Sequence, residues 1–451
     1  MNHHVYCFAG LLVLTGFITG CQTTAFDVEL QEAAGEVHRR TGWKPDWSAP
    51  WADRVSAWDG QAPLTTTQAV TAALQNNRQI RADVETIGIA RADFVQAGLL
   101  PNPVLSVALG FPSGGGAPQL TTGITQEIAA LWLLPSRVEA ASAELREAML
   151  RVSSNALELV SQVQQSHRRI SYQQIALRFL SENDKVLGQA HELATRKLRA
   201  GTGTQLDVNR IHADQLANQS QVIATQLEMD NEKRHLLELV GMADHGTDWT
   251  ADESQANPIV TVSESEVTDL ARKQRLDVLA AEWSVKARVQ RLREENLGIL
   301  PDIELGPEVE DTPGDSPRTR VGPQLGLELP IFDQNQARIA AARAELRKAV
   351  AEHAAAQQQA IREVRQAHVS YAQAGKLVAF YRDQVIPLHE SNLKLAEAGF
   401  TAGEQDLTAL LDVQRELIDA RLKMAGFERD RGVAEADLAR AAGGNLLLTR
   451  Q

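Results

Sequence analysis

Cysteine and aromatic residues are scarce in this chain, and basic residues are outnumbered by acidic ones. Only two cysteines occur, Cys7 and Cys21, and aromatic residues make up 5% of the 451 positions. Because both cysteines lie near the N-terminus, the rest of the chain can form neither a disulfide nor a cysteine-based metal site. Aspartate and glutamate (58) outnumber lysine and arginine (45), which gives a formal net charge of −13. Nucleic-acid backbones attract basic surfaces, so we expect no nucleic-acid partner.

The N-terminal segment predicts a lipid anchor. The uncharged run Val5–Ile18 is too short to span a bilayer comfortably and is followed by Thr19-Gly20-Cys21. This pattern resembles the bacterial lipobox and implies a signal peptide over residues 1–20, with diacylglycerol and N-acyl lipid on Cys21 and no other cofactor. Gln22, rather than an aspartate, indicates the outer membrane. An ordinary signal peptide with a chance cysteine is the alternative.

Residues 21–62 are interpreted as a lipid-anchored tether that packs extended along the body of the protein. They show no clean periodicity, and an amphipathic interfacial segment is the rival interpretation. Four of the seven tryptophans lie here: Trp43, Trp47, Trp51 and Trp58.

The rest of the chain repeats itself at a spacing of about 200 residues. The sequence predicts a first repeat at 63–242, a linker at 243–262, a second repeat at 263–443 and a C-terminal tail at 444–451. The matching landmarks occur in the same order: Gly98-Leu99-Leu100-Pro101 and Gly298-Ile299-Leu300-Pro301, Leu134-Pro135 and Leu329-Pro330, and Ala200-Gly201 and Ala402-Gly403.

Each repeat is expected to contain a helix, two strands and two further long helices. Helical periodicity predicts a first helix over 65–97 that Thr66 or Thr67 caps, with a counterpart over 264–296. The long helices are expected over 136–198 and 333–398, roughly 95–100 Å each, and are followed by helices over 204–240 and 404–442. Gly375 and Pro387 predict a kink. The fold class is therefore mainly α with a small β part, built on long antiparallel coiled coils.

The segments between the helices alternate as β-strands do. Each has about 9–11 residues, the length of a tilted transmembrane strand, with one apolar face and one polar or small face. Four strands cannot close a barrel, and lipid does not tolerate open edges, so this interpretation requires at least about three copies. A soluble sheet half-buried on the helices is the alternative. The expected apolar positions are Leu105, Val107, Leu109, Leu120, Ile124, Ile303, Leu305, Val309, Val321, Leu325 and Leu327.

Several motifs together resemble the TolC family of outer-membrane efflux proteins. They are the Leu-Pro-Asn-Pro-Val-Leu-Ser run at 100–106, Leu-Pro-Asp-Ile at 300–303, Leu-Pro-Ile-Phe-Asp-Gln-Asn at 329–335, and the Gly-Thr-Gly-Thr-Gln-Leu-Asp-Val tip at 201–208. The resemblance covers about residues 60–445 and is closest to the branch that serves cobalt–zinc–cadmium type pumps. It implies a homotrimer with a twelve-stranded β-barrel in outer-membrane lipid and an α-helical periplasmic tunnel.

The same resemblance implies partners and a cargo. A periplasmic adaptor and an inner-membrane proton-driven pump of the resistance-nodulation-division type are expected, with heavy-metal cations exported. Export of drugs or other small molecules is the alternative, and a structural coiled-coil lipoprotein is the alternative from a different class. The sequence has no Gly-rich phosphate loop, nucleophile elbow or His-Glu-x-x-His motif, so we expect no enzyme.

The resemblance also implies site residues. Asp207, Asp406 and Asp412 are expected at a periplasmic gate that selects cations, although Ala409 replaces one acid of the family motif and helix capping is the alternative for Asp207. Tip residues that contact the adaptor are expected at Arg199, Gly201, Gly203, Lys394, Gly399 and Gly403. The inward strand face is expected to carry Glu304, Glu308, Glu310 and Glu328. The histidines show no short metal-ligand spacing, so no fixed metal site is expected.

Overall fold

The computed structural model describes residues 24–48, 58, 62–111, 113, 117–253, 263–312 and 317–444. It contains two compact units, and each combines segments from both halves of the chain. Among the described residues, the sheet unit consists of 24–29, Glu85–Leu150 and Ala280–Ala355, and the hairpin unit of those within Leu30–Val84, Arg151–Leu279 and 356–444. Cys21, the predicted lipid site, lies outside the described residues.

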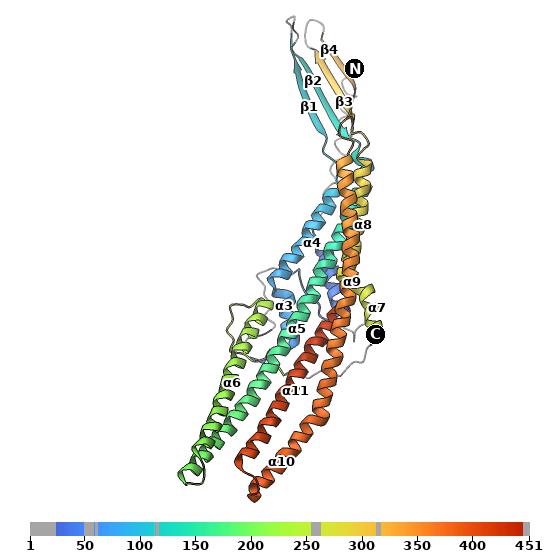
Figure 1. The fold of residues 1–451 in the computed structure, drawn as a ribbon. Coiled ribbons are helices and arrows are strands. Elements are labelled where there is room, and N and C mark those ends of the chain that lie inside the picture. Colours follow the sequence, from blue (N-terminus) through green and yellow to red (C-terminus); the bar gives the residue numbers. More distant parts are fainter. Residues whose placement is uncertain are drawn as a thin grey trace. The chain divides into compact units, whose positions relative to one another are not determined.

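The described elements are mainly helical, as predicted, with a small β part (Figure 1). In chain order they are α2 (Asp27–Thr41), α3 (Thr66–Asn76), α4 (Arg78–Ala97), β1 (Val104–Gly110), β2 (Gln119–Glu127), α5 (Ala130–Arg199), α6 (Gln205–Leu239), α7 (Glu264–Gln274), α8 (Leu276–Leu297), β3 (Ile303–Thr312), β4 (Arg318–Leu327), α9 (Gln336–Phe380), the π-helical turn η2 (Tyr381–Val385), α10 (Ile386–Ala402) and α11 (Leu407–Ala441).

The first helix of each repeat is divided, and the prediction of one continuous helix was wrong in both. Asn77 separates α3 from α4 with φ −59° and ψ 123°, and Arg275 separates α7 from α8 with φ −63° and ψ 125°. Each pair of helices starts with a capping box, from Thr65 in the first repeat and Ser263 in the second. Thr65, rather than Thr66 or Thr67, is therefore the N-cap. Neither break can be seen in the sequence, because the apolar residues keep their helical spacing on both sides of it.

The two long helical segments differ in continuity. α5 runs for 70 residues, or about 105 Å, and begins before Pro135, which therefore lies inside the helix. The counterpart is interrupted by η2, which ends two residues before Pro387. Proline lacks an N–H and its ring clashes with the carbonyl four residues earlier, so the widened turn accommodates it. The predicted interruption near Pro387 is thus present as a π-helical turn, whereas Gly375 stays within α9.

The strands form one antiparallel sheet in the order β1-β2-β3-β4. The register pairs Ser106 with Gly123, Gly123 with Glu308, and Glu308 with Gly322, which places these residues on one face. Because side chains alternate along a strand, the predicted apolar positions share the other face. Pairing between β2 and β3 is interrupted opposite Pro307, which has no N–H to donate.

The N-terminal tether is partly helical rather than extended. In the hairpin unit, α2 buries Leu30, Ala33 and Val37, and the Ser153 hydroxyl donates to the carbonyl of Ala33 at 3.3 Å. Apolar residues recur at helical spacing on this face, although the short segment did not reveal the pattern. Further along, the indole of Trp47 donates to the carbonyl of Leu74 at 3.0 Å. Residues 30–48 of the tether therefore pack within the hairpin unit.

Candidate functional site

The first hairpin tip joins α5 to α6 within the hairpin unit. Gly201 has φ 73°, a left-handed conformation that closes the turn because glycine has no Cβ. Thr204 then caps α6 and forms a reciprocal capping box with Asp207: the Asp207 N–H donates to Thr204 Oγ1 at 3.2 Å, and the Thr204 N–H and hydroxyl donate to Asp207 Oδ2 at 3.1 and 2.7 Å. These hydrogen bonds lower the pKa of the exposed Asp207 carboxyl. Asp207 is therefore an ionised capping residue.

The second hairpin tip joins α10 to α11 and uses a different cap. Gly403 has φ 76° and occupies the place that Gly201 has in the first tip. Asp406 is the N-cap, and its Oδ1 accepts from the N–H of Ala409 at 2.9 Å. Ala409 stands at the third helical position, where Asp207 stands in α6. The second tip thus carries its acid at the cap itself and has no reciprocal carboxylate.

An ion pair joins the two hairpins near their tips. Arg210 and Asp412 each lie five residues after the first residue of their helix, and Arg210 Nη2 lies 3.7 Å from Asp412 Oδ1. Arg415 Nη2 lies 3.5 Å from the same oxygen. Each partner of the first pair is about half exposed, so the ion pair is screened by water. Of the predicted gate acids, Asp412 contacts the other hairpin, whereas Asp207 and Asp406 cap their own helices.

Sequence reasoning overlooked Arg210. The signal was available, because Arg210 occupies the position in α6 that Asp412 occupies in α11 of the other repeat. A small apolar cluster lies close by in the chain and joins the same hairpins. It consists of Ala190, Ala194, Val208 and Ile211, with Leu198, Leu407 and Leu411 packed against it.

The predicted adaptor-contacting residues lie at the two tips. Arg199 and Lys394 are exposed, in the last turn of α5 and in α10. A Cβ at Gly203 would lie 3.0 Å from the Cβ of Lys197, and a Cβ at Gly399 would lie 3.1 Å from the side chain of Gln405. Both glycines therefore allow close packing within their own tips.

The polar face of the sheet carries the predicted acidic residues. Glu304, Glu308 and Glu310 share one face of β3, and Arg320 of β4 lies opposite Glu310 with its Nη1 3.7 Å from Glu310 Oε2. Glu328, the fourth predicted residue, directly follows β4. The other face exposes large apolar side chains, including Leu105 at 67% and Val321 at 73% exposure. Exposed apolar area of this extent marks an interaction surface.

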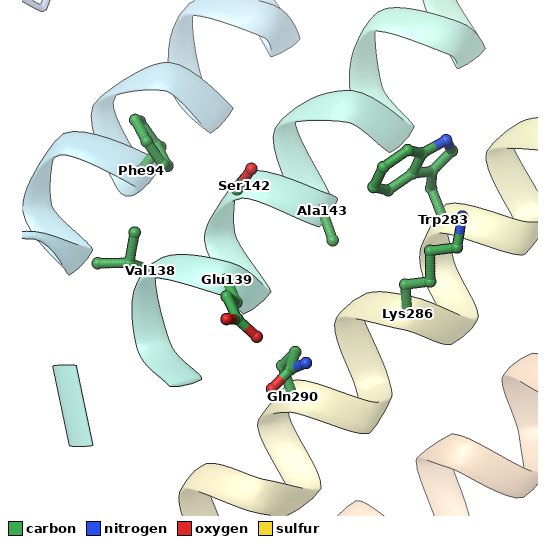
Figure 2. Close-up of a pocket in the computed structure, with 8 residues that line it drawn as sticks. All are labelled: Phe94, Val138, Glu139, Ser142, Ala143, Trp283, Lys286 and Gln290. Atoms are coloured by element: carbon green, nitrogen blue, oxygen red, sulfur yellow. The ribbon is translucent and has the colours of Figure 1, made fainter. Parts of the chain in front are cut away.

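A groove of about 450 Å³ lies between α4, α5 and α8 in the sheet unit (Figure 2). Phe94, Val138 and Trp283 contribute apolar surface to its lining. The ammonium group of Lys286 lies 4.1 Å from the centre of the Trp283 ring and 2.9 Å from Glu282 Oε1, so its charge is already paired. The one lysine of this lining is therefore already bound to neighbouring side chains rather than free for a ligand.

The described residues contain neither a metal-ligand cluster of three side chains nor a candidate membrane-spanning helix. In these ranges, no group of three or more histidine, cysteine, aspartate or glutamate side chains could hold a metal ion. None of the described helices combines the length and apolar character that a transmembrane helix needs.

Comparison with known proteins gives the family of this architecture. Residues 267–444 match the family model described as "Outer membrane efflux protein". Residues 267–444 belong to the outer membrane efflux protein family. The predicted resemblance to this family is thereby confirmed, and the match begins in the second repeat and ends after α11. The family is one of outer-membrane export channels rather than enzymes, in agreement with the location and the absence of enzymatic activity predicted from the sequence.

Two relatives and one solved structure are similar to this chain over most of its length. Nodulation protein T of Rhizobium leguminosarum bv. viciae is 22% identical over 393 residues, which cover 82% of this chain and 80% of the relative. Cobalt-zinc-cadmium resistance protein CzcC of Cupriavidus metallidurans is 23% identical over 387 residues, covering 82% and 87%. The crystal structure of a membrane protein from Pseudomonas aeruginosa has a TM-score of 0.70 at 20% identity, covering 89% of this chain and 96% of that one. This similarity shows that the fold is shared.

Proposed function

We propose that this chain forms the outer-membrane channel of a tripartite efflux system, and that it acts as a closed ring of three copies. The observation that carries the proposal is the sheet. Its four strands leave β1 and β4 unpaired at its edges, and it presents an exposed apolar face and an acidic face. A membrane-spanning sheet must pair both edges, and the described residues of one chain contain no further strand to pair them. Edge pairing of β1 with β4 of a neighbouring copy supplies the missing hydrogen bonds.

The hairpin unit supports the same assembly. Apolar side chains on α6 and on the α9–α10 segment are between 48% and 68% exposed, and they recur at steps of seven and four residues on α6 and of eight and seven residues on the α9–α10 segment. Such stripes are typical of coiled-coil seams. Because the stripes lie on helices of two different hairpins, contact between them joins one copy to the next head to tail and closes a ring. The residues are Leu216, Ile223 and Leu227 on α6, and Phe380, Leu388 and Leu395 on α9 and α10.

Charge placement favours cations as cargo. In a closed barrel with the apolar face toward lipid, Glu304, Glu308 and Glu310 of every copy line the lumen, where they outnumber Arg318 and Arg320 of β4 on the same face. A lumen of one sign concentrates ions of the other. The similarity to a cobalt-zinc-cadmium resistance protein supports heavy-metal cations. Export of other small molecules is the second candidate, since the chain is equally similar to nodulation protein T.

The tips are proposed as the periplasmic gate and as the adaptor contact. The link between Arg210 and Asp412 holds the two hairpins of one copy together. A gate that opens by separating these hairpins would break this link, and it exposes the carboxylates of Asp207, Asp406 and Asp412 to the passing ions. Arg199 and Lys394, with the tip glycines, are proposed to contact a periplasmic adaptor. That adaptor would connect the channel to an inner-membrane pump of the resistance-nodulation-division type, and lipid on Cys21 would anchor the chain.

Conductance of the purified chain in planar lipid bilayers tests the function. We expect stable cation-selective conductance, and we expect the triple variant Glu304→Gln, Glu308→Gln, Glu310→Gln to lose most of the selectivity because the luminal charge is gone. Asp311→Asn is the matched control, since Asp311 lies on the same strand but on the opposite face. Absence of conductance from correctly folded protein would overturn the channel. Unchanged selectivity in the triple variant would overturn the proposed lumen.

A further inference from the structure

Two histidines that are separated in the sequence meet across the first hairpin. His191 on α5 and His212 on α6 have ring centres 5.1 Å apart, with 36° between the ring planes (Figure 1 shows the two helices). From this geometry we propose that His191 and His212 form a binding site for one divalent transition-metal cation, such as Zn²⁺ or Cu²⁺. The site lies roughly 15 Å along the helices from the turn at Gly201.

The spacing of the two rings suits a shared metal ion. An imidazole nitrogen binds Zn²⁺ at about 2.0–2.1 Å, and two imidazoles on one tetrahedral ion have ring centres roughly 5 Å apart. The observed separation of 5.1 Å is of this size. Imidazole is a ligand that zinc, copper and nickel ions favour. His212 is exposed and His191 is partly exposed, so an ion can reach both rings from solvent.

The helix register that brings the rings together is fixed by other contacts. One side of the pair is held by the amide of Gln219, which donates to Asp184 Oδ1 at 3.2 Å, and by Asn218, whose Nδ2 donates to the carbonyl of Leu180 at 3.0 Å. On the other side, the apolar cluster that includes Ala194 and Ile211 packs α5 against α6. The two ligands are therefore pre-positioned, and binding requires little reorganisation.

The immediate surroundings decide the class and strength of the site. None of the residues three or four positions from either histidine, on the same helix face, is charged, whereas Glu192 follows His191 and Arg210 and Asp214 lie two residues from His212. Two imidazoles, with water completing the coordination, make an exchangeable site rather than a structural one. The residues one turn away are Leu187, Gly188, Ala194 and Thr195 on α5, and Val208, Asn209, Gln215 and Leu216 on α6.

This inference goes beyond the proposed channel and does not rest on it. A metal ion held by both helices would cross-link α5 to α6 whatever cargo passes through the protein. Conductance and metal binding are measured separately, so failure of one proposal leaves the other standing.

The experiment titrates Cu²⁺ and Zn²⁺ into the purified full-length protein, prepared without a histidine tag. Calorimetry gives the stoichiometry and affinity, and electron paramagnetic resonance counts the imidazole nitrogens on Cu²⁺. We expect one site per chain, with two imidazole ligands. Removing an outer-shell partner costs about 10–100-fold in metal affinity, so His212→Asn and His191→Asn are each expected to weaken binding at least about tenfold.

His235→Asn is the matched control, because His235 is an exposed histidine on the same helix α6. It is expected to leave the affinity and the two-imidazole signal unchanged. Retention of the same site in the double variant of His191 and His212 would overturn the proposal, as would a Cu²⁺ spectrum with fewer than two imidazoles in the native protein. Since His212 is exposed, its variant is expected to fold even if that of His191 does not, and circular dichroism verifies this.

Discussion

The two repeats share the same break in their first helix but hold it with different side chains. In the first repeat, the break between α3 and α4 at Asn77 is held by a neutral amide, whose Nδ2 donates to the carbonyl of Leu239 at 2.9 Å. In the second, the equivalent break at Arg275 is held by a buried guanidinium, 2.6 Å from Asp277 Oδ2 and 2.7 Å from Glu363 Oε2. The backbone angles at the two breaks nearly coincide. The repeat therefore preserves the backbone bend, while the side chains that hold it have diverged.

Substitution of the glycines at these junctions is expected to have the largest effect on the free energy of unfolding. Gly241 has φ 74°, and a Cβ there would lie 2.4 Å from the carbonyl oxygen of Asn76, whereas a Cβ at Gly443, with φ 88°, would lie 3.1 Å from the backbone of Arg275. Left-handed strain alone costs about 1–3 kcal/mol, and a backbone clash adds to it. We expect Gly241→Ala to lower the free energy of unfolding by more than about 3 kcal/mol, and Gly443→Ala by about 1–3 kcal/mol.

Urea unfolding followed by circular dichroism measures this difference between the junctions. Gly375→Ala is the control, because Gly375 lies in helix α9 with open space around it and the alanine is expected to stabilise by about 0.5–1 kcal/mol. Equal losses for Gly241→Ala and Gly443→Ala would contradict the closer packing of the first junction.

Of the two junctions, only the second is expected to contribute a stability that depends on pH in the acidic range. Burial raises the pKa of Glu363, but hydrogen bonds from Gln359 and Arg275 and the charges of Arg275 and Arg440 outweigh this and lower it to about 2. A lowered pKa stabilises the folded state fully above the unfolded value of about 4.5 and loses this effect as the pH falls toward 2. We expect Glu363→Gln to cost about 2–3 kcal/mol at neutral pH and to reduce the pH dependence between pH 4.5 and 2. An unchanged dependence of the unfolding free energy on pH in this variant would contradict an ionised Glu363 at this junction.

Substitution at the first junction is expected to lower stability by the same amount at every pH. Asn77 caps α4 through its Oδ1, which accepts from the N–H groups of Gln79 at 2.9 Å and Ile80 at 3.0 Å. We expect Asn77→Ala to cost about 1–2 kcal/mol, equally at pH 4 and pH 7, because no titrating group is removed. Comparison of its unfolding curves at the two pH values measures this. A loss that appears at only one pH would break the contrast between the junctions.

The hairpin tips give the smallest effect on stability. Arg210 and Asp412 form an exposed ion pair, which contributes at most about 1 kcal/mol. Arg210→Ala is nevertheless expected to raise the open probability in bilayer recordings, because the link between the hairpins is lost. Arg234→Ala, an exposed arginine on the same helix, serves as the control. A closed-channel frequency that stays the same in Arg210→Ala would exclude this ion pair as a latch.

Much of this architecture follows from the sequence, because its signals are periodic. The alternation in β3 and β4 predicted which residues share a face, and the register agrees for Glu304, Glu308 and Leu305. The features that could not be predicted depend on contacts between segments that are distant in the sequence. The breaks at Asn77 and Arg275 keep the helical pattern on both sides, and the pairing of Arg210 with Asp412 depends on how two hairpins pack. The gate, tip and lipidation assignments stay predictions.

The proposed ring is tested most directly by disulfide cross-linking between β1 and β4. The native cysteines, Cys7 and Cys21, lie outside the sheet, so pairs such as Val107→Cys with Val321→Cys or Leu325→Cys report only contact between strand edges. All of these positions lie on the apolar face. After oxidation in membranes, at least one pair is expected to give covalently closed sets of three chains, while single variants give none. Chains that remain unlinked for every pair along the two edges, in protein that is folded, would contradict the closed ring.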